Sequence, residues 1–244
     1  MPESTLATLL LDCFQRIVVI NLPERADRRR GIDSELRKVG LSLDHPRVEL
    51  FPAHRPERAG GFPSVGAHGA FLSHLGVMER ARAEGWSRIL VLEDDMVFTP
   101  GFARRLPQLL RAMAVRPWAM VYGHAGDDAS ARPAPDSDGL LELPGPLNLM
   151  QLHFLALDGH ALNILIPELH AMLGRAPGSP LGGPMHVDGA LNWIRHAHPD
   201  LTALAIFPPI ATQRASRSDI APTRWFDRLP LVRHLVAIAR HYRG

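Results

Sequence analysis

Three acidic residues in a row, Glu93, Asp94 and Asp95, follow an apolar run at residues 89–92. Four apolar residues of this kind are typical of a strand buried on both faces of a parallel sheet, so the carboxylates are expected at its carboxyl end. Open α/β sheets bind their ligands at that edge. Because adjacent carboxylates repel one another, a divalent cation is a natural partner for such a cluster.

Alternation along an extended chain divides these acids between two sides. Glu93 and Asp95 would face one way and Asp94 the other. Two carboxylates on one side form a partial ligand set for Mg²⁺ or Mn²⁺, whose remaining positions go to water and substrate phosphate. We therefore predict Glu93 and Asp95 as metal ligands, with Asp95 also part of the catalytic machinery. An alternative that the sequence leaves open is that the acids are solvated residues capping the following turn.

Two arginines follow another predicted strand, the β-branched run at residues 17–22. Arg25 and Arg28 would lie in the loop and first helical turn after this strand, where the guanidinium fork can hold a diphosphate or a base. For Arg29 and Arg30 we favour an ordinary solvated helix face.

A glycine-rich segment begins the helix predicted from Gly66 to about residue 84. Gly66 and Gly69 permit close approach of a ligand or a neighbouring element. His68 and His74 are six residues apart and would not share a helical face, which argues against a two-histidine metal site. Taken alone, His74 is more often a hydrogen-bonded structural residue than a catalytic one.

Asp188 lies between a Gly/Pro loop, residues 176–184, and a predicted helix over residues 188–196. A carboxylate in this place is a candidate general base that takes the proton from an attacking hydroxyl. Aspartate is also a preferred N-cap residue, so the same position fits a purely structural role.

Composition indicates one globular domain with a full-sized core, because the 244 residues are 46% hydrophobic and 21% charged. The formal net charge is only +2 and the basic residues are almost all arginine, so we expect no nucleic-acid partner. The single cysteine, Cys13, excludes an intrachain disulfide and fits a reducing, cytoplasmic compartment.

The apolar run at residues 6–11 is short and follows Glu3 rather than a basic region, so we do not interpret it as a signal peptide. No stretch approaches the roughly 18 apolar residues that span a bilayer. The expectation is a soluble or peripheral protein.

Strand and helix patterns alternate along the chain, which predicts a single α/β domain with a mostly parallel, doubly wound sheet. Residues 125–146 are rich in Gly, Pro, Asp and Ser, and a loop of this length is typical of a lid or an acceptor-binding excursion. Further strands are expected at residues 47–51, 118–122, 152–157 and 203–207, and helices at 102–114 and 159–173.

Residues 224–244 form a separate unit in this prediction. Apolar residues recur at helical spacing between 225 and 242, and Arg228, Arg233, Arg240 and Arg243 supply positive charge. Such a basic amphipathic helix can lie in the interface of an anionic membrane. Packing of the same apolar face on the catalytic domain is the alternative.

Several motifs together resemble one family, glycosyltransferase family 25, which includes lipooligosaccharide and lipopolysaccharide galactosyltransferases and relatives of procollagen galactosyltransferases. They keep the family's order over about residues 16–220. The stronger ones are Val19-Ile20-Asn21-Leu22 with Asp27-Arg28, Gly66-x-x-Gly69 leading to Leu72-Ser73-His74, Val91-Leu92-Glu93-Asp94-Asp95, and Pro100-Gly101-Phe102. The weaker ones are His153-Phe154 with Gly159-x-Ala161, Val187-Asp188, and Gln213 with Ser218-Asp219-Ile220.

The resemblance implies a GT-A-like fold over residues 1–223, that is, a Rossmann-type, mostly parallel sheet flanked by helices. It implies a UDP-sugar donor, with galactose as the sugar, and a glycan or lipooligosaccharide acceptor. Transfer would invert the anomeric centre in a single displacement with Mn²⁺ or Mg²⁺. Donor-binding residues carried over from the motifs, together with the two arginines, are Asn21, Leu22, Arg25, Arg28, Ser73, His74, Glu93 and Asp94.

The chain also departs from the family pattern. Ala70 stands where cysteine is common, Phe154 where tyrosine is common, and Pro23-Glu24 replace an acidic-basic pair. No carboxylate is lost, so we expect activity. Two other classes remain open: a metal-dependent phosphohydrolase or nucleotidyltransferase, and an inactive nucleotide-sugar or glycan-binding module.

Overall fold

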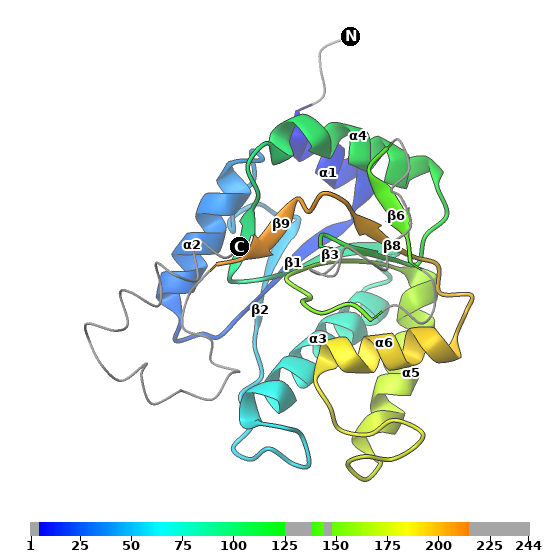
Figure 1. The fold of residues 1–244 in the computed structure, drawn as a ribbon. Coiled ribbons are helices and arrows are strands. Elements are labelled where there is room, and N and C mark those ends of the chain that lie inside the picture. Colours follow the sequence, from blue (N-terminus) through cyan, green and yellow to red (C-terminus); the bar gives the residue numbers. More distant parts are fainter. Residues whose placement is uncertain (1–4, 125–137, 144–147, 215–244) are drawn as a thin grey trace, which may run out of the picture.

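The computed structural model describes residues 5–124, 138–143 and 148–214. The predicted C-terminal helix at residues 224–244 and most of the predicted lid lie outside these residues. A seven-stranded sheet forms the centre of the molecule (Figure 1). In sheet order, its strands are β2 (Val48–Pro52), β1 (Arg16–Asn21), β3 (Arg88–Glu93), β7 (Phe154–Asp158), β5 (Met120–Tyr122), β8 (Ala203–Ile206) and β6 (Leu140–Glu142).

Five of the seven strands run in one direction. The pairs β2–β1, β1–β3 and β5–β8 are parallel, whereas β7 is antiparallel to both of its neighbours and β6 is antiparallel to β8. The α/β prediction is confirmed. The two reversed strands make the sheet mixed, and β7 separates the parallel group β2, β1, β3 from the pair β5, β8.

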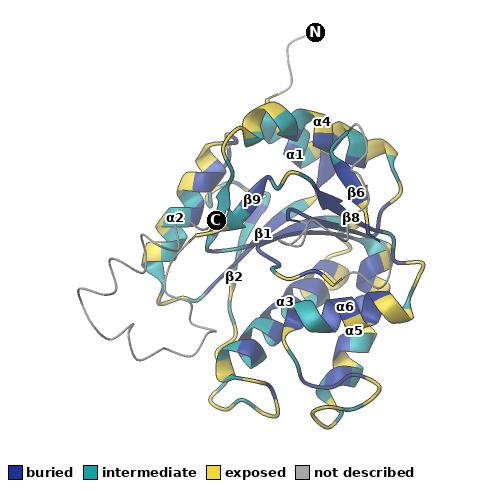
Figure 2. Cartoon of the chain, viewed as in Figure 1, coloured by how far each residue is buried: buried dark blue, intermediate teal, exposed yellow. Residues whose placement is uncertain are grey.

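Helices cover both faces of the sheet (Figure 1). One face carries α1 (Leu6–Cys13), α2 (Ala26–Arg37) and α4 (Phe102–Val115), and the other carries α3 (Val65–Ala83), α5 (Gly159–Leu173) and α6 (Val187–Ala197). Each face has its own apolar core, so the middle strands are buried on both sides, as Figure 2 shows. This explains why β1 and β3 are continuous apolar runs in the sequence rather than alternating ones.

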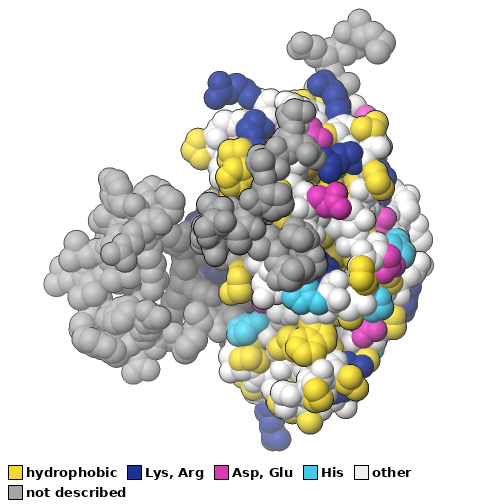
Figure 3. All heavy atoms as spheres, turned by 45° about the vertical axis from the view of Figure 1, so that its right-hand side comes forward, with side chains coloured by type: hydrophobic (Ala, Val, Ile, Leu, Met, Phe, Trp, Pro, Cys, Tyr) yellow, Lys and Arg dark blue, Asp and Glu magenta, His cyan; other side chains and the backbone are white. Residues whose placement is uncertain are grey.

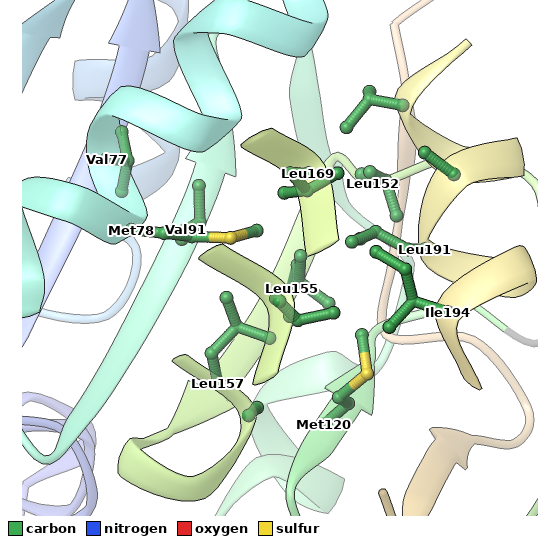
Figure 4. Close-up of a cluster of buried hydrophobic side chains, with 14 of the residues drawn as sticks. Val77, Met78, Val91, Met120, Leu152, Leu155, Leu157, Leu169, Leu191 and Ile194 are labelled. Atoms are coloured by element: carbon green, nitrogen blue, oxygen red, sulfur yellow. The ribbon is translucent and has the colours of Figure 1, made fainter. Parts of the chain in front are cut away.

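The core under α3, α5 and α6 is built from side chains of both layers. Figure 4 shows Val77 and Met78 of α3 beside Val91 of β3, with Leu155 of β7 near Leu191 of α6. On the outside, acidic, basic, histidine and hydrophobic side chains are interspersed over the face in Figure 3, and no single sign of charge dominates it.

The segment after β3 departs from the predicted alternation. β3 ends at Glu93, and Asp94 and Asp95 form a turn that leads into β4 (Met96–Phe98). β4 leaves the main sheet and pairs antiparallel with β9 (Ala211–Gln213), Met96 lying opposite Gln213. Because the chain turns at Asp94, the alternation of side chains along an extended strand does not continue through these acids.

Strand register brings the carboxyl ends of β1 and β3 to the same level. Ile20 lies opposite Glu93 in the parallel pair, so the next residue, Asn21, lies beside the acidic turn. On the other side of β1, Asn21 lies opposite Pro52. The loops after β1 and β2 and the turn after β3 therefore meet at one edge of the sheet.

Candidate active site

A cavity of about 520 Å³ lies at this edge. It is lined by the loop after β1, the first turn of α2, the loop after β2, the first half of α3, the acidic turn and the end of β9. Of the predicted site residues, the cavity wall includes Leu22, Arg25, Arg28, Ser73, His74, Glu93, Asp94 and Asp95. Asn21 and Asp188 are not part of that wall.

Asp94 is held by neutral and cationic donors. Its Oδ2 accepts a hydrogen bond from Asn21 Nδ2 at 2.7 Å, and its Oδ1 accepts one from Arg28 Nη1 at 2.9 Å. Asn21 is 2% exposed and also donates to the carbonyl of Arg25 at 3.3 Å. Asn21 thus positions Asp94 and the following loop from behind the cavity.

Of the three acids Glu93, Asp94 and Asp95, the last has the fewest compensating contacts. Arg28 Nη1 lies 3.5 Å from its Oδ2, while its buried Oδ1 has no hydrogen-bond partner among the described residues. Burial, together with the nearby Glu93 carboxylate, raises the pKa of Asp95 to about 7. Arg28 Nη1 contacts both Asp94 and Asp95, so the prediction that these two side chains face opposite ways was wrong.

Glu93 is held by residues of two other elements. Its Oε1 lies 3.2 Å from His74 Nε2, and its Oε2 accepts a hydrogen bond from Gln213 Nε2 at 3.2 Å. Burial acts to raise the pKa of Glu93, but the hydrogen bond and charge of His74 outweigh it, so the pKa lies below its ordinary value. His74 is 1% exposed. Glu93 therefore joins α3, β3 and β9.

The metal prediction can be compared with this geometry. Among residues 5–124, 138–143 and 148–214, no group of three or more His, Cys, Asp or Glu side chains is arranged to hold a metal ion. The buried Oδ1 of Asp95, which has no hydrogen-bond partner among the described residues, nevertheless fits a divalent cation, since a cation would be the positive partner of this oxygen. Two protein ligands plus water and phosphate are a usual set for Mg²⁺.

Ser73 has a structural role that the sequence did not indicate. Its hydroxyl donates to the carbonyl of Gly69 at 2.6 Å and accepts from the backbone N–H of His54 at 2.8 Å. At Gly69, an added Cβ would lie 2.6 Å from the His54 carbonyl oxygen. The small residues of α3 thus hold the loop after β2 against the cavity, and His54 is a lining residue that sequence analysis missed.

Arginines and carboxylates balance in the wall. Arg25, Arg28, Arg55 and Arg214 face Glu24, Glu93, Asp94 and Asp95, four of each sign. Arg25 pairs with Asp27 at 3.0 Å, and Arg55 pairs with Glu24. Arg55 and Arg214 were not predicted: Arg55 lies outside the motifs, and Arg214 follows Gln213 in one of the weaker ones without being part of its pattern.

Asp188 lies elsewhere on the same edge of the sheet. It occupies the first turn of α6, where the N-cap residue is His186, and its Oδ1 accepts from the N–H of Gly189 at 2.8 Å. Burial raises the pKa of Tyr122, the last residue of β5, to about 12, and the nearby Asp188 charge adds to this shift. β7 lies between β3 and β5 in the sheet, so the axes of β3 and β5 are about 10 Å apart. The N-cap alternative is wrong, and the role as a base stays a prediction.

Comparison with known proteins bears on these assignments. No protein-family model matches the chain. The mouse protein "Inactive glycosyltransferase 25 family member 3" is 30% identical over 127 residues, covering 45% of this chain and 22% of the mouse protein. A "Glycosyltransferase 25 family member" of Aedes aegypti is 31% identical over 128 residues, covering 43% and 20% respectively.

Solved structures give more distant likenesses. A glycosyltransferase involved in glycosylation of the major capsid of PBCV-1 has 12% identity and a TM-score of 0.39, over 79% of this chain and 92% of that one. Mannose-1-phosphate geranyltransferase from Thermus thermophilus has 15% identity and a TM-score of 0.42, over 83% and 64%.

The matched region spans only about a fifth of the length of these curated relatives. Within the matched region, about 30% of the aligned residues are identical, so the likeness extends beyond the order of the motifs. The resemblance to glycosyltransferase family 25 is therefore confirmed over 45% of the chain.

Proposed function

We propose that the protein is a glycosyltransferase that moves a sugar from a nucleotide-sugar donor, UDP-galactose by family resemblance, to a hydroxyl of a glycan acceptor. One observation carries the proposal: a cavity at the carboxyl ends of β1 and β3 places the acidic turn opposite several arginines. Open α/β sheets bind nucleotides at this edge. The family relationship of the sequence agrees with it.

Charge balance indicates what a diphosphate needs in this cavity. The wall has four arginines against four carboxylates, so its formal charge, counting histidines as neutral, is zero. A diphosphate brings negative charges that a neutral wall does not compensate. A divalent cation beside Asp95, with Glu93 as the second protein ligand, would supply the missing charge.

The cation would be Mn²⁺ or Mg²⁺, and when bound it would act as a Lewis acid on the diphosphate. The protein's own residues have separate tasks in this proposal. Arg28 fixes the turn by pairing with Asp94 and Asp95, and His74 with Gln213 fixes Glu93. Asp188 is proposed as the base that takes the acceptor proton, in a single inverting displacement.

Acceptor and location are proposals at the same level. The family resemblance favours a glycan of lipopolysaccharide type and a cytoplasmic enzyme. No helix in the described part of the chain is long and apolar enough to cross a membrane. Residues 224–244 are proposed to bind anionic membrane peripherally. Sedimentation with anionic liposomes tests this, since binding should weaken with salt and disappear when residues 224–244 are deleted.

A screen of nucleotide sugars for UDP release, with Mn²⁺ or with EDTA, tests the main proposal. We expect release from UDP-galactose that needs the cation. Release of phosphate or pyrophosphate would instead identify a phosphohydrolase or nucleotidyltransferase. Donor binding without turnover would identify an inactive module, the description that the mouse relative carries in its name.

A further inference from the structure

Arg214 lies next to the acidic turn although it comes from the far end of the described chain. It follows β9, and its backbone N–H donates to the carbonyl of Asp95 at 2.7 Å. The side chain lines the cavity and is 39% exposed. The β4–β9 pairing therefore delivers an arginine to the carboxylates.

A slot on α2 receives the guanidinium group. Arg28, Gly31 and Glu35 lie on one face of this helix, at spacings of three and four residues. An added Cβ at Gly31 would lie only 2.2 Å from Arg214 Nη1, so any side chain at position 31 would displace the guanidinium from the place it takes here. Glu35 Oε1 lies 3.8 Å from Arg214 Nη2.

Glu35 is itself well compensated. Its carboxylate is 6% exposed, accepts two hydrogen bonds from Lys38 Nζ at 2.7 and 2.8 Å, and accepts one from the N–H of Phe98 at 3.1 Å. Because these partners already satisfy the carboxylate, Glu35 orients Arg214 without depending on the arginine to compensate its negative charge.

The other three arginines of the cavity wall form closer ion pairs. Arg28 lies 2.9 Å from Asp94, Arg25 lies 3.0 Å from Asp27, and Arg55 contacts Glu24 directly. Glu35 keeps Lys38 and the N–H of Phe98 whether or not Arg214 stays beside it, so moving Arg214 onto an anion leaves no buried carboxylate uncompensated. Arg214 is held by the longest of these four contacts and can therefore turn to a new anion at low cost.

We propose that Arg214 binds the diphosphate of the nucleotide donor and that Gly31 and Glu35 position it; this inference rests on the proposed function. In the reaction, the bond between the sugar C1 and the diphosphate oxygen breaks and its electron pair stays on that oxygen. The acceptor oxygen bonds to C1 and its proton passes to the base. Arg214 stabilises the charge that develops on the leaving UDP.

Titration calorimetry with UDP and with uridine, in the presence of Mn²⁺, tests the inference on the full chain. Arg214→Ala should weaken UDP binding roughly ten- to hundredfold, as expected for loss of a charge-assisted contact, and leave uridine binding unchanged. Arg214→Lys should recover part of the loss. Arg30→Ala removes the same charge from an exposed position on α2 and should change neither ligand. Equal UDP affinity for wild type and Arg214→Ala would overturn the inference.

Gly31→Ala provides a second test that keeps the arginine. The added methyl group should displace the guanidinium and weaken UDP binding in the direction of Arg214→Ala, although alanine favours the helix. The double variant should bind UDP no more weakly than Arg214→Ala, and additive losses would contradict the slot. Wild-type protein that binds no UDP would instead refute the proposed function itself.

Discussion

The Asp95 carboxylate is needed for the proposed function but lowers the stability of the metal-free protein. Asp95→Asn should abolish metal-dependent transfer, because it removes the charge that would hold the cation. The same change should stabilise the metal-free protein, since the buried Oδ1 of Asp95 has no partner among the described residues.

The sign of the pH dependence follows from the raised pKa of Asp95, about 7 in the folded protein against an ordinary value near 4. Between these values the folded state binds more protons than the unfolded state, so stability falls as pH rises. Urea unfolding in EDTA should show Asp95→Asn more stable than wild type by on the order of 2 kcal/mol at pH 8, with the difference vanishing near pH 4. Asp94→Asn is the control and should destabilise, because it weakens the contact with Arg28. A stabilising Asp94→Asn would contradict this account of the turn.

Asp188 is tested by separating chemistry from stability. As a general base, Asp188→Asn should lower transfer by roughly two to four orders of magnitude with donor affinity nearly unchanged. As a structural residue in the first turn of α6, it should cost only about 0.3–1 kcal/mol through the helix dipole. Steady-state kinetics combined with thermal unfolding distinguishes the two, and unchanged kcat would exclude the base.

At the scale of elements, the contact between α3 and the loop after β2 shapes the cavity. Gly69→Ala should destabilise by about 1–3 kcal/mol, because the added Cβ meets the backbone oxygen of His54 at 2.6 Å. Gly159→Ala, at the start of α5, is the matched control. Its Cβ would meet nothing closer than 3.9 Å, so stability should stay level or rise by up to about 1 kcal/mol. Thermal unfolding of both variants checks this, and equal effects would show that the close approach at Gly69 relaxes freely.

The same elements show how far sequence reasoning reaches. Apolar runs predicted β1 and β3, and most of the donor-binding candidates taken from the motifs line one cavity. The turn at Asp94 was only an alternative in the sequence, because Asp fits a turn as well as the end of a strand and no Gly or Pro decides between the two. Arg214 was missed because its place depends on the β4–β9 pairing, which joins residues more than a hundred positions apart.

At the scale of the whole molecule, Cys13 provides a reporter of global unfolding. It ends α1 and belongs to the apolar core that also includes α2 and α4. It is 6% exposed, and burial raises the pKa of its thiol to about 11, although the charge of Arg88 acts in the opposite direction. Thiolate is therefore scarce at pH 8 in the folded protein, and alkylation needs both exposure and a normal pKa.

We expect iodoacetamide to label Cys13 only through unfolded molecules. The labelling rate should equal the intrinsic thiol rate multiplied by the unfolded fraction, so it should rise with urea along the same slope as the equilibrium unfolding curve. Because the chain has a single cysteine, mass spectrometry of the intact protein measures the labelling without ambiguity. A rate that hardly responds to urea would mean that α1 detaches by itself, and would show that the core beneath α1, α2 and α4 does not unfold as one unit with the sheet.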